Sequence, residues 1–494
     1  MPIRFDVRKA DWSTLAQPEY KPVVIVSADS HVSLPPKLYK DYLDAKHHDA
    51  WGTYLDDVAV IDKVVDLTGY PPPEDSLEVY DKRGVVSAGG EVGYFDPVWR
   101  LRHVESEGIV AEFLHPFGPI GFVPFADVQN SMTTHELRRA GSVAHNRFLE
   151  DFCSEAPGRL LGVPLIYPWP DWESGVADIV RAKECGFKAI FPPMMPGAAP
   201  GDLPALYDPW WDPMWRACQD LGMVVHIHAG FGNPQGGVVE MVRAVFSRTG
   251  GDTEGGEGLA VIDENLLPKF DPNGGEEAAG ANSFLAELFE TFGERRPLWQ
   301  LMFGGVFDRF PRLKVAFQEI HADWVPLTLD YLDKLHAREP GTLTMKPSEY
   351  WKRHCGCGTS LMRYGDVAAR HEVGIDKLMF GSDYPHFEGT WPNTHDWVRA
   401  TLGEVPENEA RAILGENAIE FYGLDRPLLE KTAKRVGPLY HELFNGAPVD
   451  RQLIRHFEFR AGINKPVSFP VDKMDQTVAA DRAGAAAALA SAHQ

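Results

Sequence analysis

Carboxylate and imidazole side chains recur in this sequence directly after short apolar runs. In the stretch LMFGSDYPHFEGTWPN, which begins at Leu378, the run LMF is followed by Asp383 and, three residues later, His386. The apolar run predicts a buried strand, and the Gly-Ser pair behind it predicts the strand's end. The bland alternative is a turn in which Asp383 caps Tyr384 and His386 is a satisfied surface group.

Other predicted strands end in the same residue types. Collected in chain order, the strand-end groups able to bind a metal or move a proton are Asp29, His31, His115, His226, His228, Glu319, His321, Asp383 and His386. Imidazoles and carboxylates without thiolates suit Zn²⁺, Fe²⁺ or Mn²⁺ rather than Ca²⁺ or Mg²⁺. His226 and His228 lie two apart and would share one face of a strand, where a pair of hydrogen-bonding core histidines is the alternative to a metal site. The proline after His115 favours a structural or substrate-facing role for that residue.

The elements that must position these groups follow a regular alternation. Eight short runs predict strands at Val23–Ala28, Val110–Leu114, Leu160–Pro164, Lys188–Phe191, Met223–Ile227, Val315–Gln318, Cys355–Thr359 and Leu378–Phe380. Apolar residues at helical spacing predict helices at Ser131–Glu155, Trp172–Cys185, Pro213–Leu221, Ala286–Phe303, Trp324–Leu335 and Tyr364–Glu372. The alternation predicts a distorted (β/α)₈ barrel, an α/β fold in which the carboxyl ends of the strands converge on one site.

Three segments depart from the alternation. Residues 35–100 are polar and rich in proline and glycine, and we expect an elaborated loop over the site. The glycine-rich insertion at 230–282 predicts a lid or binding loop, with local disorder as the alternative. Beyond residue 424 the pattern fades into an alanine-rich tail, expected to pack on a neighbouring subunit or to remain a solvated terminus. The predicted organisation is a leader at 1–21, a barrel at 22–424 and an extension at 425–494.

Composition excludes several classes of function. The formal net charge of -23 over 494 residues, without a Lys/Arg block, argues against a nucleic-acid partner. The five cysteines form no disulfide framework and favour a reducing cytoplasm, and we expect neither a signal peptide nor a membrane span. A serine hydrolase would need Gly-x-Ser-x-Gly, and a dinucleotide fold would need Gly-x-Gly-x-x-Gly after the first strand; neither motif is present.

Several motifs together resemble the amidohydrolase-related family, the branch of the amidohydrolase superfamily that includes aminocarboxymuconate-semialdehyde decarboxylase and related aromatic-acid decarboxylases. The motifs are ADSH at 28–31, HNRF at 145–148, APGRLLGVP at 156–164, HAG at 228–230, WVP at 324–326, GIDKLMFGSDYPH at 374–386, ENA at 416–418 and YGL at 422–424. The resemblance covers roughly residues 22–424. It implies a distorted (β/α)₈ barrel with one divalent metal held by residues of strands one, five and eight.

Carried over to this sequence, the resemblance implies Asp29, His31, His228 and Asp383 as metal ligands. It places His321 or Glu319, with Asp383, in the catalytic step. His386, His115 and His226 are then the candidates for binding substrate. Two departures from the family bear on the metal: strand one reads Asp-x-His, and Leu34 stands where many relatives have a glutamate. Zinc is the favoured ion, with iron or manganese, and two metals instead of one, as alternatives.

The functional hypothesis is a metal-dependent hydrolase or non-oxidative decarboxylase of a small carboxylate- or carbonyl-bearing substrate, aromatic substrates included. One alternative is a dinuclear non-haem iron or manganese oxygenase on the same fold. Another, from a different class, is a non-catalytic barrel subunit in complex with a paralogue. We expect a homo-oligomer, such as a dimer, or a hetero-oligomer with that paralogue, and no nucleic-acid or membrane partner.

Overall fold

The computed structural model describes residues 21–55, 81, 84–85, 90–116, 123–125, 134–193, 203–231, 292–386, 388–467 and 469–492. Eight strands run through these residues: β1 (Ile25–His31), β2 (Ile109–His115), β3 (Leu160–Gly162), β4 (Ala189–Ile190), β5 (Val224–His228), β6 (Lys314–Gln318), β7 (Cys355–Ser360) and β8 (Leu378–Gly381). Each overlaps one of the eight runs expected from the sequence. The predicted leader and nearly all of the predicted insertion at 230–282 lie outside the described residues.

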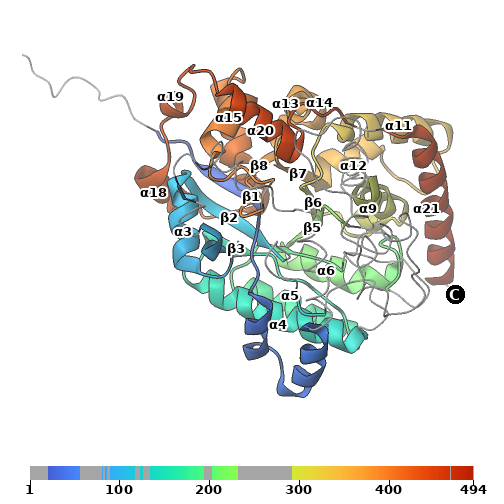
Figure 1. Cartoon of the computed structure of the whole chain (residues 1–494). Helices are drawn as coiled ribbons and strands as arrows, with labels where there is room; N and C mark the ends of the chain where they lie inside the picture. Colours follow the sequence, from blue (N-terminus) through green and yellow to red (C-terminus); the bar gives the residue numbers. More distant parts are fainter. Residues whose placement is uncertain are drawn as a thin grey trace, which may run out of the picture.

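The strands form two parallel sheets that join into a ring (Figure 1). The first sheet has the order β1-β2-β3 and the second β4-β5-β6-β7-β8. A parallel bridge between Leu165 and Phe191 links the end of the first sheet to the start of the second. Just past the end of β8, the amide of Asp383 donates to the carbonyl of Asp29 in β1 at 2.9 Å, which closes the circle. The fold is therefore the predicted distorted (β/α)₈ barrel.

Helices surround this ring (Figure 1). They are α3 (Pro97–Ser106), α4 (His135–Ser154), α5 (Trp172–Glu184), α6 (Asp212–Leu221), α9 (Phe292–Phe303), α10 (Val306–Arg309), α11 (Trp324–Arg338), α12 (Pro347–His354), α13 (Tyr364–Ala368), α14 (Arg370–Val373), α15 (Thr394–Leu402), α16 (Glu407–Arg411), α17 (Asn417–Tyr422), α18 (Arg426–Val436), α19 (Tyr440–Leu443), α20 (Arg451–Ala461) and α21 (Val471–Ala492). The single helix expected at Tyr364–Glu372 is divided into α13 and α14. The other expected helices agree with the structure to within a few residues at their described ends.

Helix α3 begins inside the segment expected to be an elaborated loop, at residues 35–100, and extends six residues beyond it. Asp96 caps it by accepting from the amides of Val98 and Trp99, but its buried face carries Arg100 and His103, so its apolar periodicity is weak. The buried Arg100 guanidinium donates to both carboxylate oxygens of Glu112 on β2, at 2.7 and 2.8 Å. It also donates to the carbonyl of His31 at 2.7 Å, so α3 fixes the end of β1 on which the site is built.

The C-terminal extension is ordered and packs on its own chain. Helix α21, red in Figure 1, runs beside α9 and α11. Its buried Asp481 accepts hydrogen bonds from Trp299 Nε1 at 2.8 Å and from Gln300 Nε2 at 3.1 Å, both on α9. One face of this helix is therefore buried on its own chain, through Met474, Val478, Asp481 and Ala485, and is not solvated. The expected packing on a neighbouring subunit stays a prediction. Among the described residues, no helix is both long and apolar enough to cross a membrane.

Candidate metal centre

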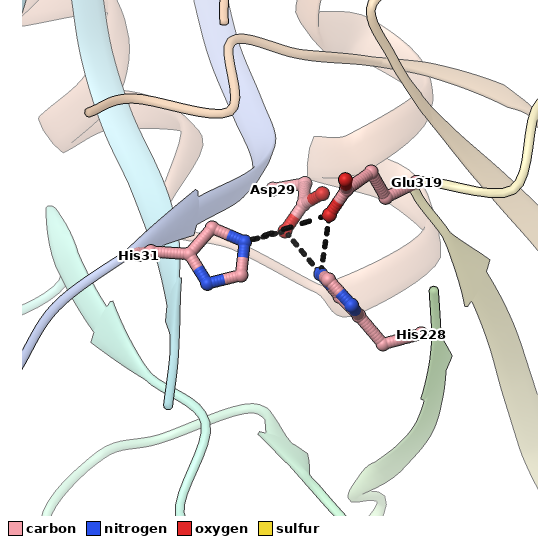
Figure 2. A group of neighbouring side chains, drawn as sticks. All are labelled: Asp29, His31, His228 and Glu319. Carbon is pink, nitrogen blue, oxygen red and sulfur yellow. Dashed lines mark hydrogen bonds and ion pairs between the residues drawn. The ribbon is translucent and has the colours of Figure 1, made fainter. Parts of the chain in front are cut away.

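Four side chains from three strands meet at the carboxyl end of the barrel (Figure 2). They are Asp29 and His31 of β1, His228 of β5, and Glu319, which follows β6. The Nε2 of His228 lies 3.3 Å from Asp29 Oδ1 and 3.2 Å from Glu319 Oε2. The Nε2 of His31 lies 3.8 and 3.7 Å from the same two oxygens. Ligands about 2.1 Å from a tetrahedral zinc ion are themselves roughly 3.4 Å apart, so these spacings suit a shared cation.

The two imidazoles are oriented so that the same nitrogen points into the group. His31 Nδ1 lies 3.2 Å from the Pro116 carbonyl, and His228 Nδ1 lies 3.2 Å from the Ala229 carbonyl. A carbonyl can only accept, so each Nδ1 carries a hydrogen, and each Nε2 is the nitrogen that faces the carboxylates and would bind an ion. Fixing the tautomer from the far side of the ring is the usual arrangement of metal-binding histidines.

A second group overlaps the first. His31 and Glu319 also belong to a cluster with Asp383 and His386, whose ligand atoms all lie within 4.8 Å of one another. Asp383 Oδ1 lies 3.2 Å from His31 Nε2 and 3.0 Å from His386 Nδ1. Of the four ligands implied by the sequence, the structure thus brings Asp29, His31 and His228 together with Glu319. Asp383 contacts the same Nε2 of His31 as a member of the second group.

Backbone conformation explains how Glu319 reaches the site. Gln318 faces the barrel interior, so simple strand alternation would turn Glu319 outward. Glu319 instead has φ 57°, and Asp383 at the end of β8 has φ 55°. Such left-handed conformations cost roughly 1–3 kcal/mol for a non-glycine residue and cluster at functional sites. At these two positions the strained turn directs a carboxylate inward.

Charge is concentrated in this buried space. Burial raises the pKa of Asp29, but the charges of His228 and His115 outweigh burial and hold that pKa well below its ordinary value. Burial likewise raises the pKa of Asp383, while the charge of His386 and the hydrogen bond from His31 bring it below the ordinary value. Burial and the charge of Asp383 raise the pKa of Glu319 to about 7. Three carboxyl groups face one another here, and a cation would relieve their repulsion.

The residues fit a divalent ion. Asp383 Oδ2 is buried and has no hydrogen-bond partner among the described residues. Two imidazole nitrogens and two carboxylate oxygens, without a thiolate, match the ligands preferred by zinc, iron and manganese. Ser360 donates to Asp29 Oδ2, which leaves Asp29 Oδ1 directed at the group. The arrangement thus meets the requirements of ligand type, orientation and spacing.

The remaining candidates from the sequence lie outside both groups. His115 and His226 are fully buried, and both ring nitrogens of each are within hydrogen-bond distance of a partner. His321 has φ 59° and its Nδ1 lies 3.5 Å from Asp366 Oδ2, which itself holds the amides of Ala322 and Arg363. Their catalytic or substrate-binding roles stay predictions.

The structure also shows polar residues that the sequence did not single out. Ser360 contacts Asp29, Tyr422 contacts His226, and Gln318 donates to Tyr422. Glu294 of α9 is a fully buried carboxyl group that accepts from the Gly230 amide at 2.8 Å. Only Tyr422 carried a signal, as part of the YGL motif. The others are polar residues inside apolar or glycine-rich runs, and only the fold reveals what faces them.

Comparison with known proteins gives a consistent result. A family profile described as amidohydrolase matches residues 122–424, more than half of the chain. A search of curated protein sequences found no match. Among solved structures, 5-carboxyvanillate decarboxylase from Sphingomonas paucimobilis is 16% identical, with a TM-score of 0.52, covering 82% of this chain and 100% of that one. An amidohydrolase from Mycobacterium avium subsp. paratuberculosis K-10 is 19% identical, with a TM-score of 0.51, covering 67% and 75%.

A third structure is similar to the same degree. The 5-carboxyvanillate decarboxylase from Novosphingobium aromaticivorans, complexed with manganese and 4-hydroxy-3-methoxy-5-nitrobenzoic acid, is 17% identical, with a TM-score of 0.50. The match covers 81% of this chain and 96% of that one. At such identities the likeness concerns the fold, which is shared by many activities.

Proposed function

The chain belongs to the amidohydrolase family, and we propose that it is a metal-dependent enzyme that decarboxylates or hydrolyses a small carboxylate-bearing substrate. The observation that carries this proposal is the group formed by Asp29, His31, His228 and Glu319. A divalent ion bound there would act as a Lewis acid toward a carboxylate or carbonyl oxygen. The solved neighbours that are decarboxylases of aromatic acids make aromatic carboxylates the first substrates to test.

The side chains around the group divide into two roles in this proposal. His31 and His228 present Nε2 to the ion, and the buried carboxylates of Asp29 and Glu319 complete the set. Asp383 Oδ1 lies 3.0 Å from His386 Nδ1 and 3.2 Å from His31 Nε2, and its second oxygen has no hydrogen-bond partner among the described residues. We assign that oxygen to holding or accepting a proton of the reacting water or substrate. His386, only partly buried, lies where it can contact the substrate beside Asp383.

Metal content tests the proposal. The chain purified without a tag should carry close to one Zn²⁺, Fe²⁺ or Mn²⁺, measured by elemental analysis. His228→Asn should reduce that content strongly. His354→Asn is the matched control, because His354 is also a buried imidazole but bonds the Leu313 carbonyl, away from the group. Wild-type protein with less than about 0.2 metal per chain, or equal retention in both variants, contradicts the proposal.

Reaction class needs a separate assay. A panel of hydroxylated aromatic acids, monitored for CO₂ release, should give turnover with at least one member if the enzyme is a decarboxylase. A panel of esters, amides and β-diketones of similar size tests hydrolysis. Activity that requires the bound ion and is lost in His228→Asn assigns the reaction to this site.

The overlap of the two groups supports a second candidate, a dinuclear iron or manganese oxygenase. His31 and Glu319 are common to both groups, and a carboxylate is able to bridge two ions. This candidate predicts about two metal ions per chain and oxygen consumption during turnover. One ion per chain and turnover without oxygen uptake exclude it. A chain without metal or activity alone, which co-purifies with an active paralogue, would instead favour the non-catalytic subunit.

A further inference from the structure

A continuous hydrogen-bonded chain of side chains leads away from Asp29 through the interior of the barrel. Asp29 Oδ1 lies 2.7 Å from His115 Nδ1. His115 Nε2 lies 2.7 Å from His226 Nδ1, and His226 Nε2 lies 2.8 Å from the Tyr422 hydroxyl. Gln318 Nε2 donates to that hydroxyl at 2.9 Å. The chain connects β1, β2 and β5 with helix α17, far along the sequence.

The direction of every hydrogen bond in this chain is fixed by its two ends. His115 Nδ1 faces two acceptors, the Asp29 carboxylate and the Ser30 carbonyl at 3.3 Å, so it carries the hydrogen. In a neutral imidazole Nε2 is then an acceptor and must receive the Nδ1 hydrogen of His226. The Nε2 of His226 is in turn an acceptor, and the Tyr422 hydroxyl donates to it. All donors therefore point toward Asp29.

Packing holds this chain away from water and in one arrangement. Asp29, His115, His226 and Gln318 are fully buried, and Tyr422 is 5% exposed. The ring of Phe113 lies 4.1 Å from that of Tyr422. Gly358 of β7 leaves the space into which Gln318 extends, because a Cβ at position 358 would overlap the Gln318 side chain. A dry polar chain in which the imidazole and hydroxyl donors are all used is expected to be rigid.

We propose that Tyr422 and His226 are positioning residues that act through His115 to fix the orientation of Asp29, and thereby set the affinity of the metal centre. The inference rests on the proposed function, since it needs a metal at Asp29. The physical reason is the tautomer of His226, that is, which of its two ring nitrogens carries the hydrogen. Without the Tyr422 hydroxyl, His226 Nε2 has no donor, and His226 can place its hydrogen there instead of on Nδ1. His115 Nε2 then loses its donor, and the hydrogen that orients Asp29 is no longer fixed.

Tyr422→Phe tests this with little change in shape. The dissociation constant for Zn²⁺, measured by competition with a chromophoric chelator, should rise by about 10- to 100-fold, the usual effect of removing a partner behind a metal ligand. Tyr39→Phe is the matched control. The buried Tyr39 hydroxyl also contacts a buried imidazole, His145 Nδ1 at 2.9 Å, and lies near the Leu34 amide at 3.3 Å, but it does not contact the chain to Asp29.

A purely structural role would lower the thermal stability of both metal-free variants and leave the affinity for Zn²⁺ unchanged. Wild-type affinity in Tyr422→Phe, or an equal loss in Tyr39→Phe, overturns the inference. A wild-type chain that binds no Zn²⁺ refutes the proposed function and this inference together. Tight wild-type binding with an unaffected Tyr422→Phe refutes the inference alone.

A second pair of variants addresses the His226 hydrogen directly. In His226→Asn the amide nitrogen can occupy the position of Nδ1 and donate to His115, whereas His226→Leu has no donor. We expect His226→Asn to bind Zn²⁺ at least tenfold more tightly than His226→Leu. Equal affinities in the two variants contradict a role for this hydrogen bond.

Discussion

Replacing Asp383 by asparagine should separate chemistry from folding at the end of β8. The substitution keeps the size of the side chain and removes its charge. Among the described residues, Ser382 Oγ, and not the Asp383 side chain, lies near the Tyr384 amide, at 3.3 Å. Asp383 Oδ1 is instead directed at His31 and His386. The consequence should therefore appear in turnover.

The expected size of the effect follows from these contacts. The charge of His386 and the hydrogen bond from His31 overcome burial and lower the pKa of Asp383, so the carboxylate is ionised at neutral pH. In Asp383→Asn its second oxygen is replaced by an amide that cannot accept a proton. We expect turnover to fall at least ~100-fold, the lower range for losing general acid-base help. The free energy of unfolding of the metal-free protein should change by only about 1 kcal/mol, since one acceptor for the two imidazoles remains.

Both quantities can be measured on one preparation, by initial rates on the best substrate and by urea unfolding after chelation of the metal. Asp323→Asn is a useful control, because Asp323 is another buried carboxyl group near a strand end but belongs to neither metal group. An Asp383→Asn protein that is nearly fully active but fragile would refute the reasoning. Loss of turnover to the same extent in Asp323→Asn would show that the effect is not specific to Asp383.

Three further substitutions test the surroundings of the site. Gly381→Ala places a Cβ about 3.0 Å from Asp29 Cβ, and chelator competition should show Zn²⁺ binding at least tenfold weaker. Burial raises the pKa of Glu294 to about 7, so ionisation above that pH costs the folded state free energy. Urea unfolding should therefore show Glu294→Gln to be more stable than wild type near pH 8, by up to roughly 3 kcal/mol, with the difference lost as the pH falls toward 4.5. Asp481→Ala leaves the buried Trp299 Nε1 without its acceptor, and thermal unfolding should show a loss of about 1–3 kcal/mol.

The barrel could be predicted well from the sequence because each buried strand has a recognisable local pattern of residues. Short apolar runs that end in glycine, proline or a polar pair mark the buried strands of a parallel sheet, and all eight such runs are strands. Helix α3 was missed for the complementary reason. Its buried face holds Arg100, whose charge is paired with Glu112, and such a pair is invisible to a pattern that equates burial with apolar residues.

The sequence predicted which residues of the candidate site lie at strand ends, but it could not predict how their side chains are arranged relative to one another. Alternation along β5 correctly turns His226 and His228 to the same face, yet it cannot say that the two residues lie at different depths, one beside the metal group and one within the chain from Tyr422. For Glu319, strand alternation predicts the wrong direction of the side chain. Its position beside His228 depends on a left-handed backbone conformation, which strand periodicity does not encode.

These two departures from simple alternation are connected through Gln318. Gln318 faces the interior by the alternation of β6, and the left-handed conformation of Glu319, the next residue, turns that side chain inward as well. Glu319 joins the metal group, while Gln318 donates to Tyr422 at the other end of the hydrogen-bonded chain. Gly358 on the neighbouring strand provides the space for this arrangement. The strained position therefore adds a candidate ligand directly after the donor that terminates the network behind Asp29, which is a physical reason to retain the strain.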